Sequence, residues 1–514
     1  MIAGRLLARN TLLNLAGQVL PAAAAIVATP ILMRSIGEAR FGILLLVWAA
    51  VGYFSLFDFG IGRALTHAVA TRIGSRATHE LSRVTWTALA MMLGLGVFGG
   101  VLVVLVTPFV TTHVLKIPVE LTGEARAAFY LTAAVLPFML LTDGFRGILE
   151  AFQDFGAATA LRLPLATLSY FAPVLVLPFS RNLAVVVAAL LAVRLAGSIA
   201  HAWVCIRRYE FLQGTIDTDR SLVRPLLGFG GWMTVSNIIS PLMVNLDRFM
   251  IAAALTVNAV TYYATPYEAA SRLWLIPAAL MGVLFPAFAA VYVSDRARTV
   301  RLLDRAVRVI IAAVFPPALV LVAFAHEGMT LWIGAAFAQH SAAILQWLVA
   351  GIFVNSAAQV AYTAVQGTGR PDLTAKLHLV ELPLYVAAFW ILTKSFGLIG
   401  AVIAWDLRIV FDLVVLFWMA GRQLPEARAA LAKAASALVV LSGLLAIAGL
   451  MSTTTTRVAA VVGGSLVFAG LCWTSLIRAP ERALLIGWLR RAPAVPAVPA
   501  PAAELQDSLT APLG

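Results

Sequence analysis

Residues 84–110, VTWTALAMMLGLGVFGGVLVVLVTPFV, carry no charged side chain, and this stretch decides the class of fold. A helix needs about 20 mainly apolar residues to cross the hydrocarbon core of a bilayer, so the stretch predicts a membrane-spanning helix. The whole chain of 514 residues has the same character, because 61% of its residues are hydrophobic and 12% are charged. Soluble domains carry roughly 25% charged residues. The composition therefore excludes most soluble enzymes and predicts an all-α polytopic membrane protein.

Similar apolar windows recur along the chain, separated by charged residues or by glycine and proline. They predict about 14 transmembrane helices. The windows are 12–33, 41–69, 84–110, 126–148, 160–180, 183–206, 227–253, 259–291, 305–326, 341–366, 373–394, 398–420, 431–451 and 457–478. The Ala/Pro-rich segment 479–514 is predicted to be a disordered cytoplasmic tail.

The distribution of basic residues predicts the orientation, because Lys and Arg concentrate in cytoplasmic loops. With a cytoplasmic N-terminus, the cytoplasmic segments hold 25 of the 37 basic residues and the opposite side holds 7. Both termini are therefore expected in the cytoplasm. The net charge of +13 largely reflects these loops, and we expect no nucleic-acid partner.

The sequence offers little for catalysis or for a bound cofactor. Its predicted loops are too short for a catalytic or nucleotide-binding domain, and no GxxxxGK[ST] motif is present. Cys205 and Cys472 each lie in an apolar stretch, which disfavours a disulfide framework or a Cys-based metal site. The histidines at 67, 201 and 378 lie in separate windows and are expected to be structural. We therefore expect no enzyme activity, catalytic residue, cofactor or metal.

A faint internal repeat suggests that the chain has two related halves. Residues 151–156, AFQDFG, follow the fourth window and resemble residues 364–369, AVQGTG, after the tenth. Asn14 and Asn237 have a similar offset. Because six helices separate the copies, both halves would enter the membrane in the same direction, related by a pseudo-two-fold axis along its normal. Chance similarity among small residues is the alternative.

Twelve ionisable residues fall within the apolar windows, where each charge costs at least ~2.5–3.5 kcal/mol. Such side chains usually face a bundle interior or a water-filled cavity. Because seven of the twelve are acids and five are arginines, the count does not support a uniformly cationic cavity. The arginines could only be concentrated in one part of it. The twelve are Asp58, Arg63, Asp143, Arg194, Asp247, Arg248, Glu268, Arg272, Glu381, Asp406, Arg408 and Asp412.

Helical spacing indicates partners for some of these charges. Glu268 and Arg272 are four residues apart, as are Arg408 and Asp412, so each pair can neutralise itself along one helix face. Each pair has two interpretations: a structural ion pair, or part of a cavity that binds an anionic head group, H⁺ or Na⁺. Arg272 is the strongest single candidate because it lies near the middle of its window.

Residues 10–66 resemble the start of the bacterial polysaccharide or oligosaccharide-lipid flippases (Wzx/RfbX type). These belong to the multidrug/oligosaccharidyl-lipid/polysaccharide (MOP) exporter superfamily. Later stretches are similar too, namely Asp247-Arg248 followed by Tyr262-Tyr263, residues 276–286, and QGTGRP at 366–371 followed by FGLIGA at 396–401. In order and spacing, the resemblance covers about residues 5–420.

The resemblance implies a MATE/MOP-like fold, with two six-helix lobes around a central cavity and two additional C-terminal helices. We expect an N-terminal lobe at 1–206, a cytoplasmic linker at 207–226, a C-terminal lobe at 227–420 and the last two helices at 431–478. It also implies that arginines line the cavity and that acids orient them or couple to an ion. The cavity candidates are Arg63, Arg248, Arg272, Arg408 and Asn14, and the charge-partner or ion-coupling candidates are Asp58, Asp247, Glu268 and Asp412.

The implied function is alternating-access transport of undecaprenyl-diphosphate-linked oligosaccharide, such as an O-antigen or exopolysaccharide repeat unit, across the bacterial inner membrane. Arginine suits this cargo because its guanidinium bonds phosphate oxygens in a fork. The expected partners are the lipid-linked oligosaccharide and the phospholipid bilayer, with H⁺ or Na⁺ and other polysaccharide-assembly proteins as further candidates. The alternatives are a cation-coupled multidrug exporter, a peptidoglycan-precursor flippase, and a membrane scaffold of a polysaccharide-assembly complex.

Overall fold

The computed structural model describes residues 20–54, 61–74, 78–152, 154–224, 246–292 and 295–476. Across these ranges the chain forms helices joined by short connections, and they contain no strand. Eight of the described helices are long and apolar enough to cross a membrane. The prediction of an all-α polytopic membrane protein is thus confirmed, while the number of fourteen helices stays a prediction. The proposed tail at 479–514 lies outside the described residues.

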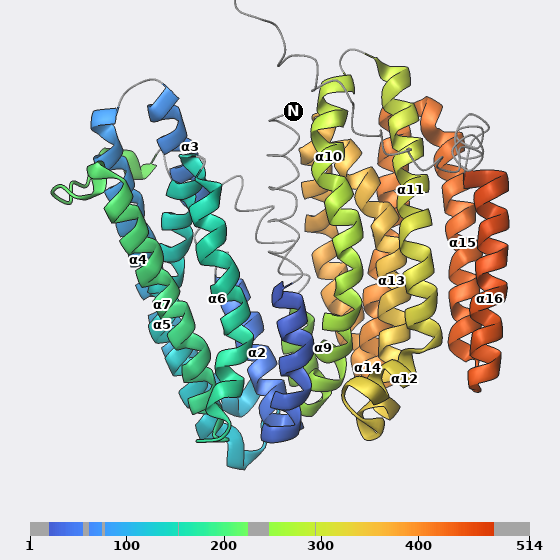
Figure 1. Ribbon diagram of the computed structural model, residues 1–514, viewed down its shortest axis with the longest axis horizontal. Helices are drawn as coiled ribbons and strands as arrows, with labels where there is room; N and C mark the ends of the chain where they lie inside the picture. Colours follow the sequence, from blue (N-terminus) through green and yellow to red (C-terminus); the bar gives the residue numbers. More distant parts are fainter. Residues whose placement is uncertain are drawn as a thin grey trace, which may run out of the picture. The chain divides into compact units, whose positions relative to one another are not determined.

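The helices of the N-terminal half pack around α5 (Figure 1). α5 contacts α3, α4 and α7, and α6 packs against α7. The elements of this half are an apolar helix Leu20–Ile36, α2 (Glu38–Phe54), α3 (Ile61–Gly74), α4 (Leu81–Phe109), α5 (Thr122–Ala151), α6 (Phe155–Val176) and α7 (Leu183–Arg208).

The helices that follow pack around α13, which contacts α9, α10, α11, α12 and α14. The elements are a helical stretch at 246–254, α9 (Val257–Ser271), α10 (Leu275–Tyr292), α11 (Arg296–Ala323), α12 (Ala325–Trp332), α13 (Ala335–Gly367), α14 (Pro371–Gln423), α15 (Arg428–Leu450) and α16 (Thr454–Leu471). The chain divides into two compact units, Met1–Val461 and Val462–Gly514.

Two predicted windows, 373–394 and 398–420, lie in one continuous element with a kink. α14 is interrupted at Gly397, whose φ of 64° and ψ of −143° are not helical. A positive φ favours glycine, because a Cβ atom is strained there. The predicted break between the two windows is therefore present as a kink at this glycine.

The window 259–291 contains a local change of helix type. α9 ends at Ser271, a 3₁₀ turn covers Arg272–Trp274, and α10 begins at Leu275. The backbone stays right-handed helical through the turn, with φ of −63° and ψ of −23° at Arg272, so the helix tightens there and continues. This arrangement sets the geometry of the charged residues described below.

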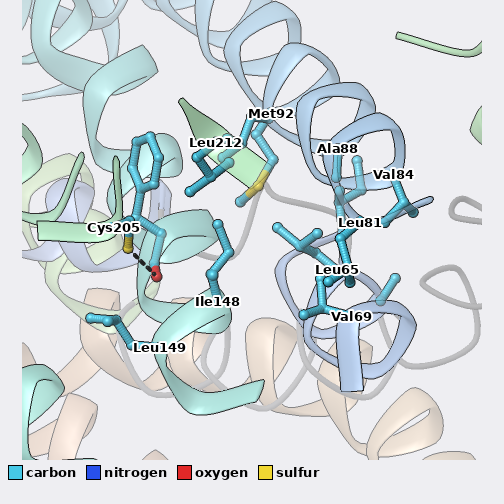
Figure 2. Close-up of a cluster of buried hydrophobic side chains, with 14 of the residues drawn as sticks. Leu65, Val69, Leu81, Val84, Ala88, Met92, Ile148, Leu149, Cys205 and Leu212 are labelled. Carbon is cyan, nitrogen blue, oxygen red and sulfur yellow. Dashed lines mark hydrogen bonds between the residues drawn. The ribbon is translucent and has the colours of Figure 1, made fainter. Parts of the chain in front are cut away.

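Buried apolar side chains join α3, α4 and α5 (Figure 2). Leu65 and Val69 of α3 lie in the same cluster as Leu81 and Val84 of α4, and all four are at most 3% exposed. The cluster extends to the short 3₁₀ turn Glu210–Leu212. The connection after α7 is thereby anchored to the N-terminal half.

The outer face of α4 presents large apolar side chains to its surroundings. Phe98, Val101 and Leu105 are 69%, 53% and 71% exposed. A contiguous apolar surface of this kind is unfavourable in water and favourable in hydrocarbon. The exposed stripe supports the assignment of α4 as a helix in contact with lipid.

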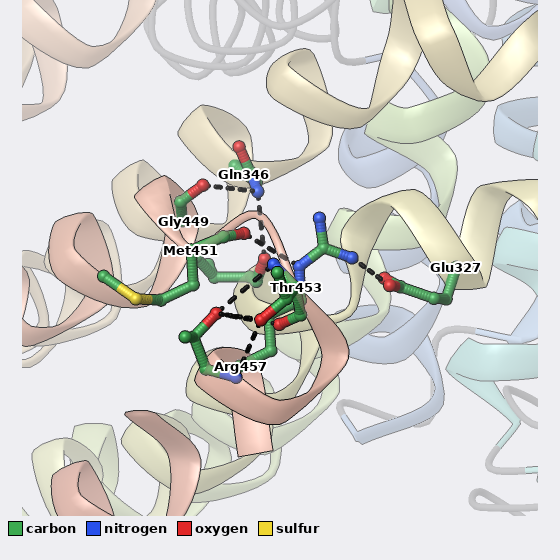
Figure 3. A network of polar contacts seen from close by, with 8 residues as sticks. Glu327, Gln346, Gly449, Met451, Thr453 and Arg457 are labelled. Carbon is green, nitrogen blue, oxygen red and sulfur yellow. Dashed lines mark hydrogen bonds and ion pairs between the residues drawn. The ribbon is translucent and has the colours of Figure 1, made fainter. Parts of the chain in front are cut away.

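A polar network joins α13 to the ends of α11 and α15, and joins α12 to the start of α16 (Figure 3). Gln346 of α13 donates hydrogen bonds to the carbonyl oxygens of Val322 and Gly449 over 3.1 and 3.3 Å. Arg457 donates to the carbonyl of Met451 over 2.9 Å and pairs with Glu327 of α12. These contacts satisfy carbonyl groups at the helix ends, which lack partners within their own helices.

Candidate substrate cavity

The buried Arg248 is held by a carboxylate on α9. Its Nη2 atom donates to Oε1 of Glu268 over 2.8 Å, and its side chain is 7% exposed. The guanidinium carbon lies 5.8 Å from the centre of the Tyr267 ring, which gives a cation–π contact. Glu268 also approaches Nη2 of Arg272 at 3.5 Å, so the predicted pair between residues 268 and 272 forms. One carboxylate therefore serves two arginines.

Asp247 points to a different part of the same helix. Its Oδ2 atom accepts a hydrogen bond of 2.6 Å from the Tyr263 hydroxyl, and its Oδ1 atom accepts from the backbone N–H of Arg248. The residue is only 1% exposed. As adjacent residues on a helix must do, Asp247 and Arg248 reach separate partners. Asp247 is thus a buried, hydrogen-bonded anchor between the helix at 246–254 and α9.

A cavity of about 310 Å³ opens beside the ion pair of Arg248 and Glu268. It is lined by Arg248 and Glu268 together with Arg194 of α7 and Tyr170 of α6. Tyr170 also interacts electrostatically with Arg272. Apolar residues of α2, among them Trp48, complete the wall. The cavity therefore brings together polar groups from both halves of the first compact unit.

A second cavity, of about 240 Å³, shares Val51, Gly52, Ala166 and Arg194 with the first. It adds Asp143, Arg146, Arg162 and His201, and Arg146 lies 3.1 Å from Asp143 in an ion pair. Together the two cavities have four arginines and two acids in their walls. We call this lining the arginine tract: Asp143, Arg146, Arg162, Arg194, Arg248 and Glu268.

A separate group of buried charges lies on α14. Arg408 is 3.7 Å from Glu381 and stacks over the Tyr385 ring at 5.3 Å. His378, Glu381 and Asp412 have ligand atoms within 4.8 Å of one another. We call His378, Glu381, Arg408 and Asp412 the acidic cluster, because two carboxylates there face one guanidinium.

Several polar atoms of the acidic cluster lack a hydrogen-bond partner among the described residues. They are both carboxylate oxygens of Glu381, Oδ1 of Asp412 and Nε of Arg408. Glu381 is 2% exposed. Buried polar groups without partners are costly, and such groups call for a bound water, an ion or a functional role. A neighbouring cavity of about 440 Å³, lined by His378, Arg408 and Asp412, gives access to the cluster.

The structure separates the candidates that the sequence grouped together. Arg248, Arg272 and Glu268 lie together, and Asp247 adjoins them. Arg408 and Asp412 belong to the acidic cluster. Those two residues interact electrostatically, but the ion pair that Arg408 forms within 4 Å is with Glu381, on the other side of the kink. Arg63 lies in α3, and Asn14 and Asp58 fall outside the described residues.

Sequence reasoning missed some residues of both sites. Arg194 lies in an apolar window but has no charge partner at helical spacing, and a lone tyrosine such as Tyr170 carries no spacing signal. Arg146 and Arg162 lie near the ends of their windows and are among the 25 basic residues that the sequence predicts on the cytoplasmic side. Glu381 and His378 were not linked to Asp412, because 31 or more residues separate them from it in sequence. Only the position of Arg194 and Glu381 inside apolar windows could have indicated them.

Polar contacts also join the two halves at the end where α2 and α9 begin. The Tyr262 hydroxyl donates to Oε2 of Glu38 over 2.5 Å, and the Thr261 hydroxyl donates to the Glu38 carbonyl over 2.8 Å. Nearby, Arg34 donates to the carbonyl of Ile333 over 2.8 Å. In the predicted orientation this is the outer end of the helices.

Comparison with known proteins places this geometry in context. The model of a family described as polysaccharide biosynthesis protein matches residues 7–291. A putative O-antigen transporter of Shigella flexneri is 29% identical over 416 residues, which cover 80% of this chain and 97% of the relative.

Solved structures share the fold at low sequence identity. An inward-facing multidrug-resistance MATE transporter of the MOP superfamily matches with a TM-score of 0.66 and 16% identity, covering 82% of this chain and 99% of that one. The lipid II flippase MurJ in an inward closed conformation matches with a TM-score of 0.68 and 13% identity, covering 91% and 100%. These likenesses confirm the predicted MATE/MOP-like fold.

Proposed function

This chain belongs to the polysaccharide biosynthesis protein family, and on that premise we propose that it is a flippase for undecaprenyl-diphosphate-linked oligosaccharide in the bacterial inner membrane. Such a cargo presents a diphosphate and sugars that must be kept out of hydrocarbon. Its polyprenyl chain, in contrast, stays in lipid. The similarity to a putative O-antigen transporter supports the same class of cargo.

The arginine tract is the observation that carries the proposal. Its walls hold four arginines against two acids, so this region is cationic although the intramembrane charges as a whole are acidic. Guanidinium groups bond phosphate oxygens in a fork, and their number here exceeds what the local carboxylates neutralise. We assign Arg194 and Arg248 to the diphosphate and Glu268 to holding Arg248 in place.

The proposal is tested with the full chain reconstituted in vesicles that carry a fluorescent undecaprenyl-diphosphate oligosaccharide. A membrane-impermeant reagent measures the fraction of cargo in the outer leaflet. We expect movement of cargo in vesicles with the protein and little in protein-free vesicles. Equal leaflet exchange in both preparations would contradict the function.

Two alternatives within the superfamily differ in cargo. A multidrug exporter for organic cations would place cations against the arginine tract, which is electrostatically unfavourable. A peptidoglycan-precursor flippase would carry another lipid-linked diphosphate. The same vesicles loaded with a peptidoglycan precursor or with a cationic dye separate the three, because the preferred cargo moves fastest.

The acidic cluster supports a second part of the proposal, coupling to one monovalent cation or proton. Glu381 and Asp412 face Arg408, which leaves one negative charge in excess in a buried place. The unpartnered oxygens of Glu381 and Asp412 fit such an ion, because an isolated buried charge is unfavourable until it is neutralised or paired. The residues that would hold H⁺ or Na⁺ are therefore Glu381 and Asp412, with Arg408 as their resident counter-charge.

Glu381→Gln tests the coupling, with Asp372→Asn as the control. Asp372 is an acid at the start of α14 that lies outside the cluster and pairs with Arg370 and Lys376. We expect an imposed pH or Na⁺ gradient to accelerate transport at least several-fold in the control and to have little effect in Glu381→Gln. If both variants respond equally to the gradient, the cluster does not couple transport.

Alternating access requires that the two ends open in turn. The contacts of Glu38 with Thr261 and Tyr262 join the halves at the end that we assign to the outside. We assign the lobes to residues 1–206 and 227–420, with a cytoplasmic linker at 207–226, and both termini to the cytoplasm. A scaffold of a polysaccharide-assembly complex would not depend on these contacts, so cross-linking residues 38 and 262 should arrest a flippase and leave a scaffold functional.

A further inference from the structure

A cavity of about 650 Å³ lies between the end of α14 and the start of α15 and is lined by Leu413 and Arg422 among others. None of its lining residues belongs to the arginine tract or to the acidic cluster. Its walls are mainly apolar and include Phe417 and Leu431, whereas Arg422 and Arg428 also line it. The two arginines are close to the α14–α15 turn. The cavity thus combines an apolar surface with two cations near one end, as a phospholipid combines an acyl chain with a charged head.

Both arginines are available to an anion. Arg422 stacks over the Trp418 ring at 5.0 Å, and Arg428 donates one hydrogen bond, from Nε to the Gly421 carbonyl over 2.9 Å. Among the described residues, neither forms an ion pair with a carboxylate. α15 begins at Arg428 without a side-chain cap. The acid nearest to its start in sequence, Glu426, lies in the preceding 3₁₀ turn Pro425–Ala427 and forms no ion pair with either arginine among the described residues. The partial positive charge of this helix end adds to that of the arginines.

The cavity has the dimensions of one leaflet. Residues 413 to 422 span about 14 Å along a helix, and half of the bilayer core is roughly 15 Å thick. Val414 and Trp418, which also line the cavity, are 61% and 57% exposed. In a membrane protein, apolar side chains with this exposure face lipid. An acyl chain can therefore reach the cavity sideways from the bilayer.

We propose that this cavity binds an anionic phospholipid, with its phosphate between Arg422 and Arg428 and an acyl chain against Leu413, Phe417 and Leu431. Basic pockets between transmembrane helices are known to bind anionic lipid heads on the cytoplasmic side. That is the side to which the basic-residue distribution assigns the α14–α15 turn. The arginine tract consists of other residues, so the lipid and the transported cargo would bind at separate sites. The lipid would then stay bound while cargo moves.

The test measures binding of phosphatidylglycerol to the purified full chain. Native mass spectrometry counts retained lipid, and thermal unfolding is followed in phosphatidylcholine vesicles with and without phosphatidylglycerol. The variant is Arg422→Gln/Arg428→Gln. Its matched control is Arg207→Gln, because Arg207 also stacks over a tryptophan, Trp203 at 4.7 Å, and does not line this cavity.

We expect phosphatidylglycerol to raise the unfolding temperature of the wild type and of Arg207→Gln, and the double variant to lose at least half of that increase. Retained phosphatidylglycerol should fall at least threefold in the double variant. Ala432→Phe, which fills the cavity and keeps both arginines, should reduce retention as well. An equal loss in Arg207→Gln would show non-specific surface attraction and overturn the proposal. So would binding of undecaprenyl diphosphate but not of phosphatidylglycerol.

Discussion

Gly42 of α2 lies so close to the carbonyl of Val257 in α9 that a Cβ atom on residue 42 would overlap it. The same atom would also meet the Thr261 hydroxyl at 3.0 Å. Glycine at this position therefore allows the backbones of the two halves to touch. The hydrogen bonds from Thr261 and Tyr262 to Glu38 depend on this approach.

Gly42→Ala should separate α2 from α9 and open this end of the protein. Overpacking of this kind typically costs 1–3 kcal/mol. The measurement is the rate of maleimide labelling at Thr261→Cys in a Cys472→Ser background, where the other cysteine, Cys205, is fully buried. We expect labelling to become several-fold faster.

Gly94→Ala is the control for this substitution, because a Cβ at residue 94 of α4 meets nothing within 4 Å. Its labelling rate at residue 261 should equal that of the parent. Unchanged labelling in Gly42→Ala would mean that the two helices adjust without separating.

Arg248 and Glu268 allow stability and transport to be separated. Arg248→Gln leaves Glu268 without its nearer partner. Because Glu268 is 34% exposed and stays close to Arg272, we expect a cost below the roughly 3–5 kcal/mol of a fully buried pair. We expect the unfolding temperature and the transport rate both to fall. In Arg248→Gln/Glu268→Gln the unpaired carboxylate is removed, but Arg272 also loses its partner, so stability should recover in part while transport stays at least tenfold reduced.

Thermal unfolding and the leaflet assay together check this prediction. Arg248→Lys keeps the positive charge but cannot form two parallel hydrogen bonds to a phosphate. We expect this variant to move cargo at an intermediate rate. If the double variant recovers transport along with stability, Arg248 has a structural role only.

The fold was predictable because its determinants are local. Apolar windows of about 20 residues report membrane-spanning helices, and Gly397 stands at the break expected between two of them. The pair of Glu268 and Arg272 follows from helical spacing in the same way. Each of these features depends on residues close together in the chain.

The sites were less predictable because they combine residues that are distant in sequence. Arg408 pairs with Glu381 across the kink at Gly397, and spacing alone favoured Asp412. Arg194 and Arg248 line the same cavity only because α7 and the helix at 246–254 both border it. The total count of intramembrane charges therefore does not show that they are separated into a cationic and an acidic region.

Arg194→Gln should impair transport without a large loss of stability. Within the described chain, Arg194 lines both cavities of the arginine tract and forms no ion pair within 4 Å. Its removal therefore leaves no carboxylate unpaired, in contrast to Arg248→Gln. We expect at least a tenfold slower leaflet movement of cargo and a nearly unchanged unfolding temperature. Normal transport would remove Arg194 from the cargo site.

Gly397→Ala should destabilise the protein through the backbone of α14. The φ of 64° and ψ of −143° at this residue lie in a region nearly restricted to glycine, and they cost a residue with a Cβ atom on the order of 1–3 kcal/mol. Gly443→Ala in α15 is the matched control, because residue 443 is helical and a Cβ there meets nothing within 4 Å. Alanine is the better helix former, so this control should unfold at the same or a higher temperature.

The kink also has a consequence for the acidic cluster. Glu381 precedes Gly397 and Arg408 follows it, so straightening α14 would move the two side chains apart. Gly397→Ala is therefore expected to weaken the response of transport to an ion gradient as well as stability. Parallel measurements of unfolding temperature and gradient-driven transport check this, with Gly443→Ala as reference. A variant that is destabilised but fully coupled would show that the kink serves folding and does not position the cluster.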